Sequence, residues 1–252
     1  MDINIITLAI VFVVSLLASV MGSLIGGASL VTIPLLILLG LPTHTAIGTD
    51  RFGLMGIGIM GWYLFHKKGL IDYKIGVWTG IPILIGSFWG AHLVLQINES
   101  TLKLIIALIS ALLLLIVIFN PGTGIEKRKR NLKKRDYLVG ALMTFAVGIY
   151  GGFYGAMAAT FLCYILVLWF SQTFLEGAAT LKIGSISMTG MAAVVFAYKG
   201  AVDYPLGIAI FCGCCIGSVI GIHYSVRLGS VWIKRFFVLL VLIMLIKLVM
   251  QR

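Results

Sequence analysis

The chain alternates between long apolar runs and short polar or glycine-rich breaks. Several runs approach the roughly 20 apolar residues that a tilted helix needs to cross a bilayer. Five runs precede a strongly basic segment and five follow it: 3–21, 28–41, 52–66, 75–96 and 102–119, then 137–150, 155–170, 183–198, 204–226 and 231–250. This pattern predicts an all-α, polytopic membrane protein of about eight to ten transmembrane or re-entrant helices. The runs 28–41 and 155–170 are short for full spans, and whether they span or re-enter is left open.

The two sets of runs are related by an internal duplication. A displacement of 131 residues (180 − 49) aligns Thr49 with Thr180 and continues without gaps for some distance. The same register pairs Arg51 with Lys182, Lys68-Gly69 with Lys199-Gly200, and Asp72-Tyr73 with Asp203-Tyr204. Shared apolar composition would not repeat Lys-Gly-x-x-Asp-Tyr in register. Two related halves are typical of secondary transporters, whose sites lie between the repeats.

Composition agrees with a membrane protein. Hydrophobic residues make up 61% of the 252 residues, charged residues only 11%, and the mean hydropathy is +1.13. Soluble domains carry about 25% charged residues. A water-soluble fold would lack the polar surface to cover so much apolar area, whereas lipid accepts apolar side chains on the outside.

The net charge of +11 is concentrated in one place. Seven of the 19 Lys and Arg lie between Lys127 and Arg135, flanked by apolar runs. Because cytoplasmic loops are enriched in basic residues, we expect a cytoplasmic loop and no nucleic-acid partner. Binding of anionic lipid headgroups by the same loop is an alternative. The expected organisation is a first membrane repeat (1–120), a basic cytoplasmic loop (121–136) and a second membrane repeat (137–252). Inverted repeats place slightly more basic residues inside than parallel ones, so we prefer them, with both termini outside.

Glycine-rich breaks are the first candidate for chemistry. Gly22-Ser23-Leu24-Ile25-Gly26-Gly27-Ala28-Ser29 corresponds to Gly151-Gly152-Phe153-Tyr154-Gly155 in the second half. Glycine lets the backbone turn and approach a ligand, and the Tyr154 hydroxyl could donate to an oxyanion. Close helix packing through small residues explains the same glycines equally well.

A repeated hydroxyl and cation form the second candidate. Thr49-Asp50-Arg51 and Thr180-Leu181-Lys182 each place a hydroxyl two residues before a cation, at the expected start of an apolar helix. A cation inside a membrane is a functional hypothesis by default, and hydroxyls with a guanidinium suit an oxyanion. Alternatively, both cations snorkel to headgroups. The predicted substrate-binding residues are Gly26, Gly27, Ser29, Thr49, Asp50, Arg51, Tyr154, Gly155, Thr180 and Lys182.

Motifs for enzymatic chemistry are missing from the sequence. We find no Gly-x-Ser-x-Gly, Walker loop or His-Glu-x-x-His. The chain is therefore expected not to be an enzyme and to need no cofactor and no metal.

At these residues the chain resembles the TauE/SafE family of sulfite exporters and organosulfur-anion permeases. The resemblance rests on Gly26-Gly27 with Pro34, Ala46 to Arg51, Gly152 to Gly155, and Ala178 to Lys182. It implies an inner-membrane transporter that exports sulfite or a related sulfur oxyanion. The expected partners are that anion and membrane lipid, with a homodimer left open. Alternatives are uptake of thiosulfate, a sulfonate or a carboxylate, and a membrane protein that binds without transporting. Asp50 departs from the family pattern, in which Asn or Ser is more frequent.

Overall fold

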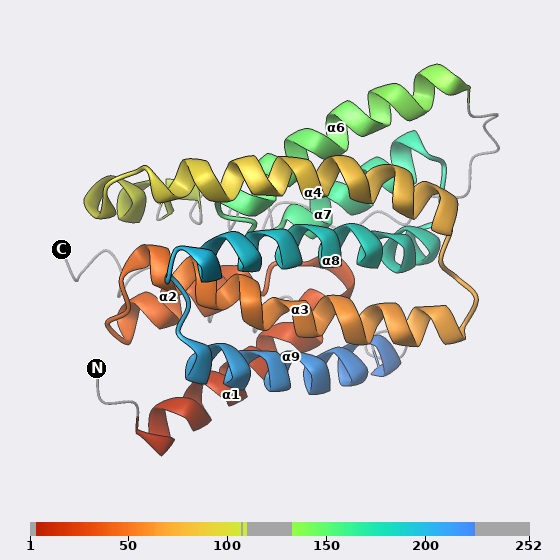
Figure 1. The fold of residues 1–252 in the computed structure, drawn as a ribbon. Helices are drawn as coiled ribbons and strands as arrows, with labels where there is room; N and C mark the ends of the chain where they lie inside the picture. The colour runs from red at the N-terminus through yellow and green to blue at the C-terminus, as the bar shows by residue number, and fades with distance from the viewer. Residues whose placement is uncertain (1–3, 107, 110–132, 225–252) are drawn as a thin grey trace.

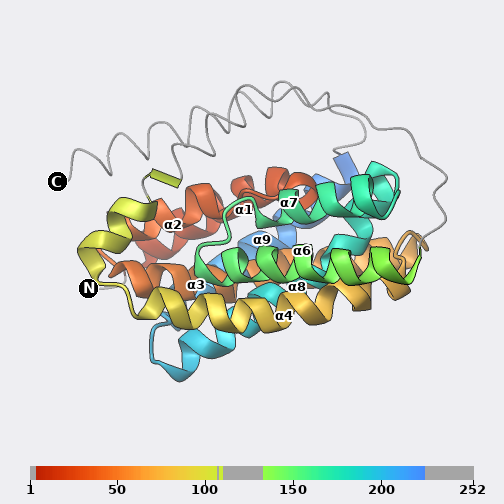
Figure 2. The same cartoon turned by 90° about the horizontal axis from the view of Figure 1, so that it is seen from above.

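The computed structural model describes residues 4–106, 108–109 and 133–224, and every regular element within them is a helix. The helices form an elongated bundle with their axes roughly along one direction (Figure 1, Figure 2). They are α1 (Ile5–Ile25), α2 (Ser29–Leu38), α3 (Thr43–Lys67), α4 (Tyr73–Leu95), α6 (Lys134–Phe153), α7 (Ala158–Tyr164), the π-helix η1 (Ile165–Trp169), α8 (Phe174–Tyr198) and α9 (Tyr204–Tyr224). The predicted all-α class is confirmed.

Five of the described helices are long and apolar enough to cross a membrane. They contain the candidate spans Ile5–Ser23, Tyr73–Leu95, Lys134–Phe153, Phe174–Tyr198 and Tyr204–His223. Large apolar side chains also cover the outside of the bundle: Leu138 and Leu142 on α6 and Val194 on α8 are each nearly two-thirds exposed. Water would penalise such a surface, whereas lipid matches it. The polytopic membrane class is thus confirmed.

Helices α3 and α8 begin earlier than the sequence predicted. The apolar runs start at residues 52 and 183, but the helices start at Thr43 and Phe174. Arg51 and Lys182 therefore lie two turns inside their helices, and the expectation that each cation lies at the start of its helix is wrong. The helices continue through these polar stretches because the polar groups are buried against partners in other helices.

Two short helices follow the glycine breaks. Helix α2 has 10 residues, which at about 1.5 Å per residue gives roughly 15 Å, half the thickness of the hydrocarbon core. The apolar stretch Ala158–Trp169, formed by α7 and η1, is also shorter than a span. Helix α2 turns back toward the end of the bundle at which α1 begins (Figure 2). The apolar runs 28–41 and 155–170 therefore form half-helices rather than full spans.

Corresponding helices of the two halves run in opposite directions. Figure 1 shows α3 and α8 antiparallel at the centre, and α4 and α9 likewise opposed. Each half also packs on the other, since α4 lies along α6 and α1 lies along α9. These directions are the ones that inverted repeats require. The segments 110–132 and 225–252, which hold most of the basic loop and the run 231–250, lie outside the described residues.

Glycines allow the helix pairs α4–α6 and α1–α9 to approach each other closely. A Cβ atom added to Gly90 of α4 would lie 2.8 Å from the backbone nitrogen of Phe153 in α6. Gly213, Gly217 and Gly221 of α9 similarly meet the backbone of α1. Small residues allow helix backbones to approach in this way.

Residues 99–106 are also helical, and Glu99 ties the start of this stretch to α3 at one end of the bundle. The Thr43 amide and hydroxyl both donate to its Oε1, and His44 Nδ1 lies 3.3 Å from its Oε2. Burial raises the pKa of Glu99, but the Thr43 hydrogen bonds and nearby His44 outweigh it, so this pKa lies below its ordinary value. The contact anchors the bundle away from the breaks.

Candidate functional site

Both glycine breaks depend on backbone conformations that favour glycine. Helix α1 ends before Gly26 and Gly27, which have φ angles of 85° and 101°. The second break has Gly155 at φ 70° and Met157 at φ 60°, just before α7 begins. Glycine adopts positive φ without steric cost, so each first helix can stop inside the bundle. The sequence prediction that these glycines turn the backbone is confirmed.

The breaks meet each other and α3 at the centre of the bundle. A Cβ on Gly26 would lie 2.9 Å from the Cβ of Ala159 in α7, and a Cβ on Gly155 would collide with the guanidinium of Arg51. A partly open cavity of about 40 Å³ lies between them. Its lining comes from both breaks, α3 and α8: Gly22, Gly26, Gly27, Ala28, Ser29, Arg51, Leu54, Ile57, Gly155, Ala159, Ser185, Met188 and Thr189.

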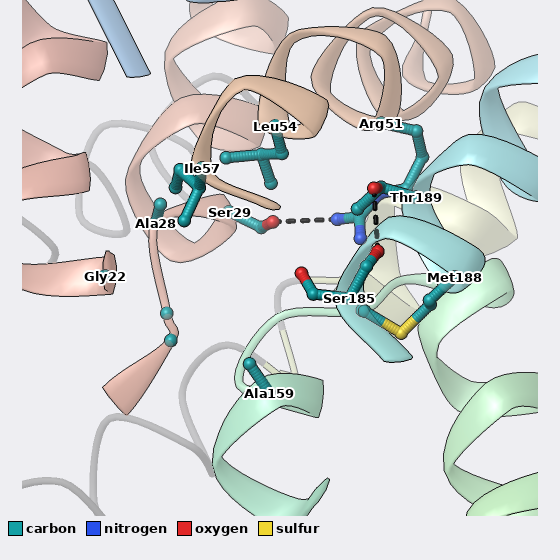
Figure 3. A pocket seen from close by; sticks show the side chains of 13 residues that line it. Gly22, Ala28, Ser29, Arg51, Leu54, Ile57, Ala159, Ser185, Met188 and Thr189 are labelled. Atoms are coloured by element: carbon teal, nitrogen blue, oxygen red, sulfur yellow. Dashed lines mark hydrogen bonds between the residues drawn. The ribbon is translucent and has the colours of Figure 1, made fainter. Parts of the chain in front are cut away.

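Arg51 is the cationic group of this cavity. Its side chain is 1% exposed. Its Nη2 donates to Ser29 Oγ at 2.7 Å, to Asp50 Oδ2 at 2.7 Å and to Tyr154 O at 2.8 Å. Figure 3 shows the guanidinium directed toward Ser29, with α8 on the other side. Its Nε is buried and has no hydrogen-bond partner among the described residues, so one donor of the guanidinium is unsatisfied.

Asp50 holds Arg51 in place from the neighbouring position. The Asp50 carboxylate accepts hydrogen bonds from Ser29 Oγ at 2.9 Å and from the Thr32 hydroxyl, in addition to Arg51. It is fully buried and does not line the cavity. Asp50 therefore positions the start of α2 and the guanidinium, and balances the Arg51 charge.

Lys182 of α8 is the residue that the internal alignment pairs with Arg51, but it does not line the cavity. Its ammonium donates to Ser23 O near the end of α1, and its stem packs against Gly61 of α3. Arg51 likewise reaches carbonyls at the end of α6, at Tyr154 and Gly151. Each cation thus caps the first helix of the other half, where the helix dipole is negative. Both cations are buried rather than snorkelling, and only Arg51 lines the cavity.

Thr49 and Thr180 lie outside the cavity. The Thr49 hydroxyl accepts the Asp203 amide at 2.8 Å, and the Thr180 hydroxyl accepts the Asp72 amide at 3.1 Å. Each threonine therefore fastens the helix-connecting turn of the opposite half. Tyr154 is also outside the lining residues and offers its carbonyl to Arg51. Of the predicted residues, the structure brings Gly26, Gly27, Ser29, Arg51 and Gly155 together at the cavity.

Sequence reasoning missed the contribution of α8. Ser185, Met188 and Thr189 line the cavity, and Ser185 and Thr189 are nearly buried. They follow Lys182 at three and seven residues, and so lie on the same helix face. That spacing was the signal that could have identified them. In Figure 3, Ser185 and Thr189 lie on α8 across the cavity from Ser29.

The chemistry of the cavity suits a small oxyanion. It offers a guanidinium with a spare N–H, three hydroxyls and the amino end of α2, where helix N–H groups and the dipole favour negative charge. Leu54, Ile57 and Met188 supply an apolar wall. In the part of the chain that the structure describes, no three His, Cys, Asp or Glu side chains gather as metal ligands.

A helical bundle with two half-helices meeting at a buried cation is the architecture of a membrane transporter. The chain belongs to the Sulfite exporter TauE/SafE family, whose sequence pattern matches residues 11–248. It is 27% identical to a probable membrane transporter protein of Haemophilus influenzae, over 99% of this chain and 97% of that protein. It is also 27% identical to YdhB of Bacillus subtilis (89% and 93% covered) and 25% identical to YfcA of Escherichia coli (96% and 89%), both described as probable membrane transporter proteins. No solved structure matches the chain.

Proposed function

We propose that this protein exports sulfite or a related small sulfur oxyanion across the plasma membrane. The observation that carries the proposal is the cavity at Arg51, whose lining combines this guanidinium with the hydroxyls of Ser29 from the first half of the chain and of Ser185 and Thr189 from the second. An anion there would receive charge-assisted hydrogen bonds that neutral solutes cannot exploit. The family to which the chain belongs is named for sulfite export, which favours a sulfur oxyanion over other anions.

Orientation follows from the basic residues at the helix ends. The end of α3 (Lys67, Lys68), the start of α4 (Lys74) and the start of α6 (Lys134, Arg135) lie at one end of the bundle, whereas the end of α8, next to Lys199, lies at the other (Figure 1). The positive-inside rule assigns the first end to the cytoplasm. The two halves then form inverted repeats, with the turn at Asp72 inside and the turn at Asp203 outside.

Export of an anion needs no ATP under this arrangement. Moving one negative charge outward gains about 2.3 kcal/mol per 100 mV of inside-negative potential. The cavity lining has Arg51 as its titratable side chain and offers no nucleophile–base pair among the described residues, which favours transport over an enzymatic reaction. Uptake would instead need coupling to protons or sodium.

Radiolabelled sulfite in proteoliposomes tests the function. We expect saturable efflux that speeds up when the membrane potential drives anions outward, and no such flux from protein-free liposomes. A competition panel of thiosulfate, methanesulfonate, acetate and chloride separates the substrates, with methanesulfonate, a monovalent sulfur oxyanion, expected to inhibit most strongly. Inhibition by acetate alone would favour a carboxylate transporter. Saturable binding of sulfite without flux would instead favour a binding protein and contradict the proposal.

A further inference from the structure

We infer that the cavity selects monovalent anions and excludes divalent anions of the same shape. This inference rests on the proposed transport of a sulfur oxyanion and adds the charge that the substrate must carry, so that sulfite would be carried as monovalent hydrogensulfite. The evidence for it is the sum of the buried charges near the cavity, counted among the described residues.

Carboxylates are scarce in this chain and nearly all of them are used at helix ends. The sequence has 8 Asp and Glu. Asp72, Asp203 and Glu176 accept backbone amides at the starts of α4, α9 and α8, while Asp136 accepts the Lys133 amide and Glu99 accepts Thr43. Of the two buried carboxylates among the described residues, Asp136 is 9% exposed and lies in the first turn of α6, whereas Asp50 is 0% exposed and is paired with Arg51 of the cavity lining. Asp2 and Glu126 lie outside the described residues, and the segment 225–252 contains no carboxylate in its sequence.

The cations outnumber this buried carboxylate. Arg51 is paired with Asp50 at 2.7 Å, and the pair is neutral overall. Lys182 is 1% exposed, and its ammonium donates a hydrogen bond to the Ser23 carbonyl. A carbonyl dipole satisfies a donor but carries no full charge to neutralise an ammonium. The three buried groups therefore sum to one positive charge.

This excess charge lies beside the cavity. Ser23, which accepts the Lys182 ammonium, adjoins Gly22 in the cavity lining, and Ser185 of the lining follows Lys182 by one turn of α8. An uncompensated charge in a dry interior is costly. A monovalent anion at Arg51 would bring the buried region to neutrality. A divalent anion would leave one negative charge in excess. The single positive charge would then offset only part of its larger desolvation cost.

Methanesulfonate and sulfate form a matched pair of probes for this selectivity. Both are tetrahedral sulfur oxyanions of similar size, and at neutral pH they carry one and two negative charges. In proteoliposomes with wild-type protein, methanesulfonate should inhibit sulfite flux at a concentration at least about tenfold lower than sulfate. That is the order expected for one unit charge at ~10 Å in a medium of effective dielectric constant near 20.

Charge-changing variants should move this ratio in opposite directions. Asp50→Asn raises the buried charge to two positives, so sulfate should gain relative to methanesulfonate. Lys182→Met lowers it to zero, so sulfate should lose further and sulfite should bind more weakly. Lys199→Met, at an exposed turn, removes a lysine without changing the buried balance and should leave the ratio at its wild-type value.

The outcomes separate this inference from the proposed function. Sulfite flux inhibited equally by both probes in wild-type protein would overturn the charge selectivity and leave transport standing. An unchanged ratio in Lys182→Met would do the same. A wild-type protein that moves no sulfur oxyanion would instead overturn the proposed function itself. If Asp50→Asn fails to fold, the inhibition ratios of the wild-type protein and of Lys182→Met still test the charge selectivity.

Discussion

Removal of the Arg51 guanidinium is expected to reduce sulfite flux by roughly 100-fold or more. Hydrogen bonds to a charged partner contribute about 1.5–3 kcal/mol each, and a buried anion left without its cation also pays for its desolvation. The guanidinium is the cationic group that lines the cavity. Initial rates of radiolabelled sulfite efflux from proteoliposomes measure the effect.

The choice of variant separates transport from folding. Arg51→Met alone leaves Asp50 as an unpaired buried carboxylate, because the two side chains form an ion pair at 2.7 Å. The double variant Asp50→Asn with Arg51→Met removes both charges and should fold, as judged by a monodisperse peak in detergent, yet not transport. Exposed Lys199→Met provides the control with normal flux. Wild-type flux in the folded double variant would remove Arg51 from the substrate pathway.

A single methyl group at Gly155 is expected to reduce sulfite flux strongly, through the same guanidinium. Its Cβ would collide with the Arg51 guanidinium, and the φ angle of 70° already disfavours any other residue. Gly155→Ala should therefore displace the guanidinium from Ser29 and from the Tyr154 carbonyl. We expect at least a tenfold loss of flux, since a shift of about 1 Å in a binding group can cost that much.

Gly200→Ala is the matched control for this prediction. Gly200 has a φ angle of 68°, and nothing lies within 4 Å of an added Cβ. The two variants thus share the cost of forcing alanine into the left-handed region and differ in the collision with Arg51. Equal flux in the two variants, or an equal loss, would show that backbone strain rather than the guanidinium governs the effect.

The sequence was most informative where lipid imposes a simple rule. Long apolar runs must become helices in a bilayer because every backbone polar group needs a partner. This rule located α1, α4, α6 and α9 to within a few residues of their observed bounds. It placed the beginnings of α3 and α8 too late, because polar residues and glycine interrupt the apolar pattern in their first two turns, and the contacts that bury these residues against other helices cannot be read from composition.

The same error misplaced the two threonines. Thr49 and Arg51 are two residues apart, and in an α-helix such neighbours point to different faces. Once both lie inside α3, the hydroxyl and the guanidinium cannot serve one site, and Thr49 instead binds the turn at Asp203. Ser185 and Thr189 were missed because their spacing places them on one helix face with Lys182, but only the rotation of α8 in the bundle turns that face toward the cavity. The glycine breaks were identified because positive φ angles leave a recognisable residue preference.

The position of the anion itself can be observed with selenite, the selenium analogue of sulfite. A crystal of the protein grown with selenite should give an anomalous selenium peak in the cavity, within hydrogen-bonding distance of Arg51 and close to Ser29 and Ser185. A peak found only at the headgroup level, in a preparation that transports selenite and is inhibited by sulfite, would contradict the assignment of this cavity as the transport site.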